Sequence, residues 1–267
     1  MRLMVNRYLK LWVAFFKNTL TRDMEFKLNF ILELFIDFIY YGSLFFFFQV
    51  IFQFQNTFGE FNQDAVIIFL ILLYLVDSLY VFLIGGNTFE INNKVKTGDL
   101  DFILIRPVNP QFFLSFRYVN SYAIISIILL SALLFKLTYD YHNHQLLLYN
   151  YIFCFLSVIL GIIIFYSIEF IIACLVFWFR NFSYAGWLSG ELIKYSRRPD
   201  AIYKNWFKNI LFTILPMAMI VSVPARMLLF GVNIKLLLLQ LFVSSVFLFI
   251  TVIVWKRGLK QYESASS

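Results

Sequence analysis

Charged residues are scarce in this chain of 267 residues. Only 14% of the residues are Asp, Glu, Lys or Arg, against about 25% in a typical soluble domain. Hydrophobic residues make up 61%, well above the roughly 45–50% of soluble domains. No stretch between the apolar segments is long enough to form a separate folded domain. The composition therefore excludes an ordinary soluble protein and predicts one membrane domain of about six spans.

Cysteine is also rare, and the two that occur exclude a disulfide framework. Cys154 and Cys174 lie in the same apolar stretch. Twenty residues of helix place them about 30 Å apart, which is too far for a disulfide bond. We interpret both as small buried apolar side chains.

Five apolar stretches are long enough to cross a bilayer. A helix needs about 20 apolar residues to span the hydrocarbon core, and helix satisfies the backbone where no water is present. The first 29 residues are different, because Leu11, Trp12 and Phe15 recur at helical spacing while Lys10 and Lys17 fall on the other side. We expect 1–29 to be a basic amphipathic helix in the cytoplasmic interface, although an ordinary surface helix is the alternative. The predicted spans are 30–54, 65–89, 118–137, 149–177 and 234–255.

The distribution of Lys and Arg predicts the orientation. Residues 1–29 hold six of them and residues 90–117 hold four, whereas the loops 55–64 and 138–148 hold none. Cytoplasmic loops are enriched in these residues. We therefore expect a multi-pass protein of the plasma (bacterial inner) membrane with both termini and the 90–117 loop in the cytoplasm. The net charge of +7 is then explained by loops facing anionic lipid, and nucleic acid is not an expected partner.

The fifth span is ambiguous on residues alone. Hydropathy and positive charge favour 210–230. That stretch contains Pro216 and Pro224, which kink or break a helix, and Arg226, which is costly inside a membrane.

The alternative places span five at 182–197 and makes 199–231 a re-entrant hairpin on the outer side. Gly186 and Gly190 would allow such a short span to pack closely against a neighbour. Positive-inside counting opposes this second interpretation.

Three motifs in series carry a family resemblance. Residues 92–110 read NNKVKTGDLDFILIRPVNP, residues 197–231 read RRPDAIYKNWFKNILFTILPMAMIVSVPARMLLFG, and residues 258–266 read GLKQYESAS. Together they resemble the six-span permease subunits of ABC-2 type exporters. The family pattern is met at Gly98, Leu100, Asp101, Leu104, Pro107, Pro199, Ile202, Tyr203, Pro216, Pro224 and Ala225.

The resemblance implies an all-α integral membrane fold of the type V ABC exporter kind. It has an N-terminal interfacial helix, six spans, a cytoplasmic coupling helix between spans two and three, and an outer re-entrant hairpin before span six. It favours 182–197 as span five and 199–231 as the hairpin. It also implies two partners, a separate ABC ATPase subunit that binds ATP and Mg, and a second permease copy, identical or related. The chain has no G-x-x-x-x-G-K-[ST] phosphate loop of its own, so we expect neither enzymatic activity nor a cofactor in it.

The best functional candidate is the 90–117 loop. A short polar helix here, stopped by prolines, would dock on the ATPase and move spans two and three as a rigid push. The alternative is a solvated loop that merely reverses the chain. The candidate coupling residues are Lys94, Lys96, Gly98, Asp99, Leu100, Asp101, Arg106 and Pro107.

Four carboxylates fall in the predicted spans. Buried membrane charges are expensive and usually face protein or a water-filled cavity. We consider Asp77 and Glu169 as pathway or interface positions, or alternatively as hydrogen-bonded helix contacts. Glu33 and Asp37 lie one turn apart and would form an interfacial ion-pair cluster with Arg22 or Lys27, or else a substrate site.

The remaining candidates are the hairpin residues and two histidines. His142 and His144 lack a third ligand, so we do not expect a metal site. The candidate hairpin residues are Pro199, Tyr203, Pro216, Pro224 and Arg226.

Two competing functions remain open on the sequence. A stand-alone secondary transporter would use the intramembrane carboxylates, but such proteins carry internal repeats, and we find none between residues 1–130 and 131–267. An intramembrane enzyme would need a nucleophile and base within reach, and both histidines lie in one short loop. An ATPase encoded by a neighbouring gene would favour the exporter permease over both.

Overall fold

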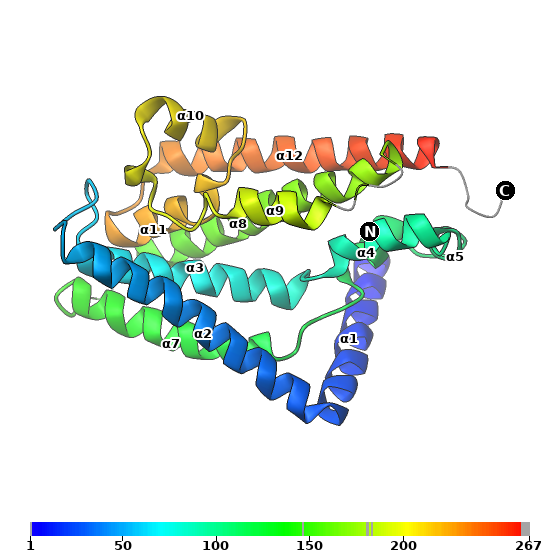
Figure 1. Cartoon of the computed structure of the whole chain (residues 1–267), viewed down its shortest axis with the longest axis horizontal. Helices are drawn as coiled ribbons and strands as arrows, with labels where there is room; N and C mark the ends of the chain where they lie inside the picture. Colours follow the sequence, from blue (N-terminus) through cyan, green and yellow to red (C-terminus); the bar gives the residue numbers. More distant parts are fainter. Residues whose placement is uncertain (1, 146, 180–181, 183, 263–267) are drawn as a thin grey trace.

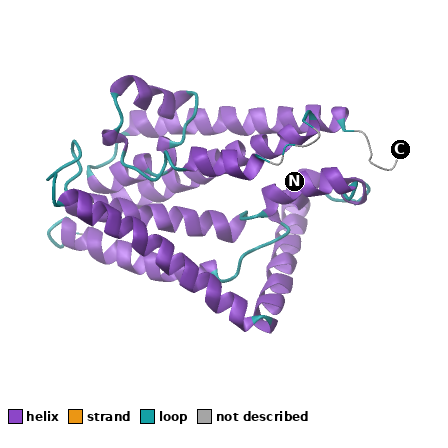
Figure 2. Ribbon diagram, viewed as in Figure 1, coloured by secondary structure: helices purple, strands orange, loops and turns teal. Residues whose placement is uncertain are grey.

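A computed structural model gives the fold of the chain and describes residues 2–145, 147–179, 182, 184–262. Across these residues every regular element is a helix (Figure 2). Five helices are long and apolar enough to cross a membrane. They are α2 (Lys27–Phe52), α3 (Gln63–Leu83), α7 (Ala123–Tyr141), α8 (Leu148–Cys174) and α12 (Ile234–Gln261).

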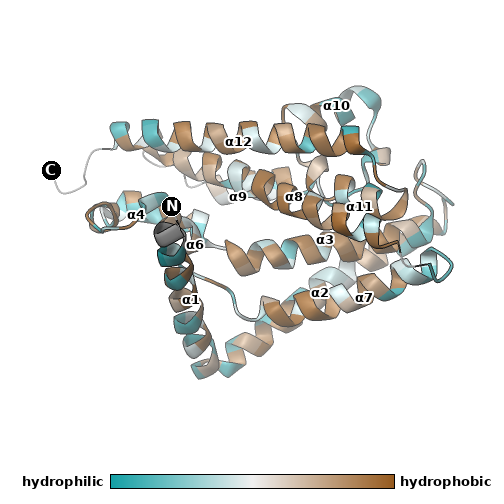
Figure 3. Ribbon diagram, turned by 180° about the vertical axis from the view of Figure 1, so that it is seen from behind, coloured by the Kyte–Doolittle hydropathy of each residue, from teal (hydrophilic) through white to brown (hydrophobic). Residues whose placement is uncertain are grey.

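The buried centre of the fold is formed by α3 and α8. In each, 61% of the most apolar stretch is buried inside the structure, against 6% in α2. α12 packs along α8, and α7 packs along α3. Figure 3 shows apolar residues around most of the long helices, as expected for helices that face lipid as well as protein.

The first helix begins at the end of the bundle where α12 ends, and we call this the terminal end (Figure 1). The helix α1 (Arg2–Glu25) lies crosswise there, and Figure 3 shows polar and apolar residues alternating along it. α4 (Asn87–Thr97), α5 (Leu100–Leu104) and α6 (Pro110–Phe116) occupy the same end. The loop at 53–62 and residues 142–145 lie at the opposite end, which we call the loop end.

The second apolar stretch is broken, whereas the sequence predicts one helix over 65–89. α3 ends at Leu83, and α4 begins at Asn87 after Gly86, whose φ of +78° is left-handed. A side chain disfavours that conformation, and glycine does not. Asn87 then fixes the chain reversal, because its side chain donates to the Tyr118 carbonyl oxygen and accepts from the Tyr118 N–H.

The ambiguous region contains only short helices. α9 (Ala185–Ile193) has nine residues and is about 14 Å long, shorter than the expected span over 182–197. α10 (Asn205–Thr213) is followed by a 98° bend and the stretch Met217–Leu229, which includes α11 (Ser222–Leu229). Pro216 lies at this bend and lacks the N–H that a continuous helix would need.

A close helix contact joins α8 to the chain just before α11. A Cβ atom added to Gly161 would lie 2.6 Å from the carbonyl oxygen of Ile220. The absence of a side chain at Gly161 is therefore what lets the two backbones approach. Four residues before Gly161, at Ser157 of α8, Gln240 of α12 donates from Nε2 to the carbonyl oxygens of Ser157 and Met219, at 3.0 and 3.1 Å.

We predict that Gly161→Ala lowers the midpoint of thermal unfolding in detergent. The added methyl group must displace the Ile220 backbone, and overpacking of this kind costs about 1–3 kcal/mol. Gly42→Ala in α2 is the matched control, because a Cβ there meets nothing within 4 Å. Tryptophan fluorescence during heating measures both midpoints. Equal midpoints for the two variants would contradict the close contact.

Candidate functional site

The candidate coupling residues form a projecting elbow at the terminal end. Gly98, with a φ of +78°, ends α4, and α5 begins two residues later. Leu100 and Ile103 of α5 point inward and are buried, whereas Phe102 and Ile105 are 65% and 79% exposed. The elbow therefore presents an apolar outer face on a buried apolar anchor.

The charged candidates surround this apolar face. Lys94 pairs with Glu90 at 3.9 Å, and Arg106 donates from Nε to the Phe102 carbonyl oxygen. Lys96 and Asp99 lie on the exposed surface.

Asp101 lies beside Tyr262 at the end of α12. Burial and the Asp101 carboxylate raise the pKa of Tyr262 to about 12, so its phenol stays neutral at physiological pH. Tyr262 of the tail motif therefore contacts the elbow through Asp101. Residues 263–266 of that motif lie outside the described residues.

Helix α1 braces the elbow from the side. Arg7 Nη2 donates to the carbonyl oxygen of Pro107 at 2.7 Å, and the Asn109 N–H donates to the Tyr8 hydroxyl at 3.3 Å. The rings of Tyr8 and Phe112 lie 4.7 Å apart. The sequence indicated an amphipathic helix here but gave no sign of these contacts, because they link residues about a hundred positions apart.

The exposed apolar pair Phe102 and Ile105 is the part of the site that sequence reasoning missed. Its signal was present, since two apolar residues three positions apart on a helix lie on one face. The family motif instead pointed to the charged, glycine and proline residues around them.

Glu169 is the centre of a buried polar cluster. Tyr80 of α3 donates to its Oε2, Thr88 of α4 donates to the same oxygen at 3.2 Å, and Ser189 of α9 donates to Oε1 at 2.8 Å. Three hydroxyl donors satisfy the carboxylate that the membrane interior would otherwise penalise. The hydrogen-bonded helix contact is therefore the role that this geometry supports for Glu169.

Asp77 of α3 lines a small pocket. It shares this pocket with Arg197, which follows α9, and with Tyr40 and Tyr74. The Arg197 guanidinium lies 5.2 Å from the centre of the Tyr40 ring. A carboxylate and a guanidinium that face one pocket partly neutralise each other, as intramembrane charges require. Arg197 was missed as a site residue because the sequence placed it at the edge of a span.

Residues next to Asp77 on α3 form hydrogen bonds with α2. Tyr74 donates to the Tyr41 carbonyl oxygen at 2.8 Å, and the hydroxyl groups of Ser78 and Tyr41 lie 3.1 Å apart. These bonds join α3 to α2.

Glu33 and Asp37 stay on α2, away from the Glu169 cluster. Glu33 lines a cavity of about 310 Å³ at the terminal end together with Arg22, Asp23 and Tyr122. Arg22 pairs at 3.3 Å with Asp23, a carboxylate that the sequence did not point to, rather than with Glu33 or Asp37.

An ion cluster at the loop end holds the candidate hairpin in place. Asp200 is fully buried and accepts from Arg226 Nε at 3.0 Å and from Lys208 Nζ at 2.5 Å. Arg226 also pairs with Glu60 in the 53–62 loop at 2.7 Å. The cluster thus joins the two arms of the bent region to the loop between α2 and α3.

The other hairpin candidates shape the backbone of this region. Pro199 precedes a short 3-10 helix, Pro224 lies in the first turn of α11, where proline is tolerated, and Tyr203 donates to the Tyr195 carbonyl oxygen at 3.0 Å.

The two histidines lie in the loop between α7 and α8. His142 Nε2 lies 3.0 Å from the Leu228 carbonyl oxygen, and His144 lies 3.5 Å from Asp140. Within the described part of the chain, no three His, Cys, Asp or Glu side chains are grouped for a metal ion.

We predict that Arg226→Met destabilises the protein by about 1–3 kcal/mol, since the buried Asp200 carboxylate loses one of its two cationic partners and keeps only Lys208. Asp200→Asn in the same chain removes that charge and restores part of the loss. Thermal unfolding of both single variants and the double variant gives the coupling between the two sites. Additive losses would show that the two side chains do not interact.

The comparisons place the chain in a family. The model of the ABC-2 family transporter proteins matches residues 38–266. No curated protein and no solved structure matches the chain. The matched range contains the elbow, the Glu169 cluster, the ion cluster and most of the five long helices. The chain therefore belongs to the ABC-2 transporter family, whose members are multi-pass membrane permeases of ABC-type transport.

Proposed function

We propose that this chain is the membrane-spanning permease subunit of an ATP-driven exporter, coupled to a separate ATPase subunit through α5. The observation that carries the proposal is the elbow itself. Phe102 and Ile105 are exposed on a short helix whose opposite face, Leu100 and Ile103, is fixed in the interior. An exposed apolar pair with a charged rim is suited to a cleft on a protein partner.

The buried side of the elbow connects it to the long helices. Leu100 and Ile103 belong to one apolar cluster with Phe113 of α6, Phe170 of α8 and Trp255 of α12. A close-packed cluster transmits displacement rather than absorbing it. We therefore infer that ATPase movement reaches α8 and α12 directly, in addition to the helices on either side of the coupling loop.

The proposed orientation puts the terminal end in the cytoplasm and the loop end outside. The charge asymmetry of the loops supports it, as does the crosswise amphipathic α1 at the terminal end (Figure 1). The bent segment 205–229 then enters and leaves the membrane on the outer side as a re-entrant hairpin. Its contacts with the 53–62 loop through Arg226 and with His142 at the end of α7 support this arrangement.

The proposed complex contains two permease copies and an ATPase that binds ATP and Mg. In support, only 6% of the most apolar stretch of α2 is buried inside the structure. The side chains of Phe35, Phe38 and Phe46 are exposed along this helix. The transport pathway would run beside α2 and α9, where Asp77, Tyr40 and Arg197 face one pocket. In a bacterial cell, the complex would be in the inner membrane.

The competing secondary transporter draws no support from Glu169. Three hydroxyl donors from three helices fix that carboxylate. A transporting carboxylate must instead exchange partners during each cycle.

We predict that Phe102→Ala with Ile105→Ala lowers co-purification of the ATPase by about tenfold, because apolar anchors at the centre of an interface carry most of its binding free energy. Asp99→Lys lowers stimulated ATP hydrolysis by reversing one charge of the rim. The variants are tested by affinity purification and a hydrolysis assay in proteoliposomes.

The matched control is Ile152→Ala with Phe155→Ala, which removes two exposed apolar side chains from the lipid-facing surface of α8. It should retain the ATPase. A tagged wild-type chain that comes out of detergent without an ATPase would refute the proposal, and equal retention by the Phe102/Ile105 variant would refute the role of α5.

A labelling experiment tests the orientation. In a background with Cys154→Ser and Cys174→Ser, we expect Asn205→Cys to react with a membrane-impermeant maleimide added to intact cells. Asp99→Cys, on the elbow, should react only after the cells are opened. Protection of position 205 with labelling from the cytoplasm would return the fifth span to 210–230.

A further inference from the structure

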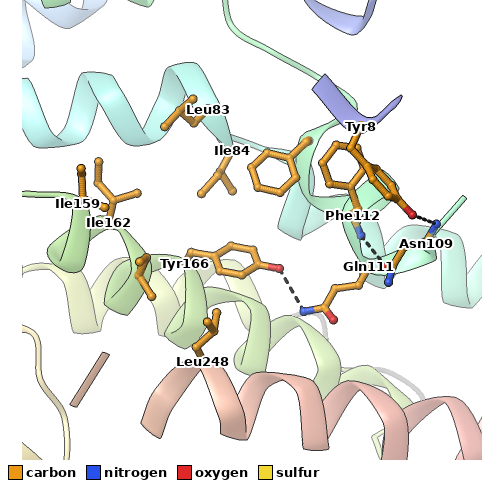
Figure 4. Close-up of a pocket in the computed structure, with 12 residues that line it drawn as sticks. Tyr8, Leu83, Ile84, Asn109, Gln111, Phe112, Ile159, Ile162, Tyr166 and Leu248 are labelled. Carbon is orange, nitrogen blue, oxygen red and sulfur yellow. Dashed lines mark hydrogen bonds between the residues drawn. The ribbon is translucent and has the colours of Figure 1, made fainter. Parts of the chain in front are cut away.

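A cavity of about 610 Å³ lies between α3, α6, α8 and α12 and is closed at one end by Tyr8 of α1 (Figure 4). We call it the amphipathic slot. Its size falls within the range of small-molecule sites, about 300–1,000 Å³. It shares no residue with the pocket around Asp77 and Arg197, so it is a separate site from the proposed pathway.

The slot is polar at one end and apolar at the other. Figure 4 shows Asn109, Gln111 and the Tyr166 hydroxyl at the end near α6, and Ile159, Ile162 and Leu248 farther along α8 and α12. Gln111 Nε2 donates to the Tyr166 hydroxyl, and Asn109 Oδ1 accepts from the Phe112 N–H. The side-chain N–H groups of Asn109 and the second Nε2 N–H of Gln111 are then available to donate to an occupant.

The two ends differ in membrane depth. The polar end lies level with α6 and α1, at the terminal end of the bundle. Ile159 lies near the middle of α8, seven residues or about 10 Å from Tyr166. Half of the hydrocarbon core is about 15 Å thick. The slot therefore runs from the interface at the terminal end to about the middle of the bilayer.

The wall of the slot opens toward lipid. Ile159 and Leu248 are each 41% exposed at the depth of the hydrocarbon core. An apolar chain enters there from the bilayer without crossing water. The 12 lining residues, all of them described, include no charged side chain. The polar end thus suits neutral hydrogen-bonding groups, such as ester and glycerol oxygens, rather than a phosphate group.

We propose that the amphipathic slot binds one acyl chain of a phospholipid from the leaflet at the terminal end, with the ester oxygens held by the side-chain N–H groups of Asn109 and Gln111. The bound chain packs against Phe112 and Tyr8, which brace the elbow. The lipid would thereby support the coupling element. The inference requires a chain that spans a bilayer and does not rest on ATP-driven export.

Photolabelling in proteoliposomes tests the site. The full chain is reconstituted in phosphatidylcholine and phosphatidylglycerol with a trace of phosphatidylcholine that carries a diazirine on one acyl chain. After irradiation, we expect mass spectrometry to find label on peptides of α8 and α12 that line the slot. Label spread equally over α2 and α7 would show only annular contact and would overturn the proposal.

Two variants sharpen the test. Ile159→Trp fills the apolar end and should lower labelling by about tenfold, whereas the matched Ile152→Trp, on the same helix but outside the slot, should leave it unchanged. If Ile159→Trp does not fold by circular dichroism, Gln111→Leu replaces it, and loss of the ester hydrogen bond should lower labelling by about threefold to tenfold. Unchanged labelling in the folded slot variant would refute the site.

Other occupants give different results. Labelling by a diazirine lysophosphatidylcholine but not by the two-chain lipid would assign the slot to a single-chain amphiphile and overturn the membrane-lipid assignment. A disulfide between two copies through Leu248→Cys, in the background without Cys154 and Cys174, would show that a second copy covers the slot instead.

Discussion

The polar side chains of α8 set the arrangement of the helices around it. Hydrocarbon offers no water to hydroxyl, amide or carboxylate groups, so each one must find a partner within the protein. Ser157 donates to Gln240 of α12 at 2.6 Å, Tyr166 shares hydrogen bonds with α6, and Glu169 accepts from α3, α4 and α9. Apolar contacts are not directional, so they would allow the helices around α8 to pack in many orientations. These hydrogen bonds are directional and allow only one.

The elbow combines two properties that rarely occur together in one short segment. Its outer face is exposed and apolar, which suits a partner, and its inner face is buried in the cluster that contains Phe170 and Trp255. Because the buried face contacts α8, the elbow is connected to the same helix that organises the polar groups. If the elbow couples to an ATPase as proposed, its movement would reach Glu169 through this helix.

The two sides of the bundle differ in their chemistry. Beside α2 and α9, Asp77 and Arg197 face a small pocket lined by tyrosines. Between α8 and α12, the amphipathic slot has no charge and an exposed apolar wall. Opposite charges suit a route for polar groups, whereas a neutral slot suits a lipid chain. If a lipid chain occupies the amphipathic slot, the pocket of Asp77 and Arg197 is the candidate pathway. A bound lipid would also explain why a large cavity lies beside Tyr8 and Phe112, which contact the elbow.

The sequence by itself determined the membrane class of the protein, its long apolar helices and the amphipathic pattern near the N-terminus, because hydropathy and helical period are local properties. It left the fifth span open, since the bend at Pro216 satisfies either interpretation until the neighbours are known. Only the tertiary structure paired Arg226 with Asp200, Asp77 with Arg197 and Glu169 with its three hydroxyl donors. Those pairs join residues 20 to 120 positions apart, and no local pattern determines which distant side chain meets a buried charge.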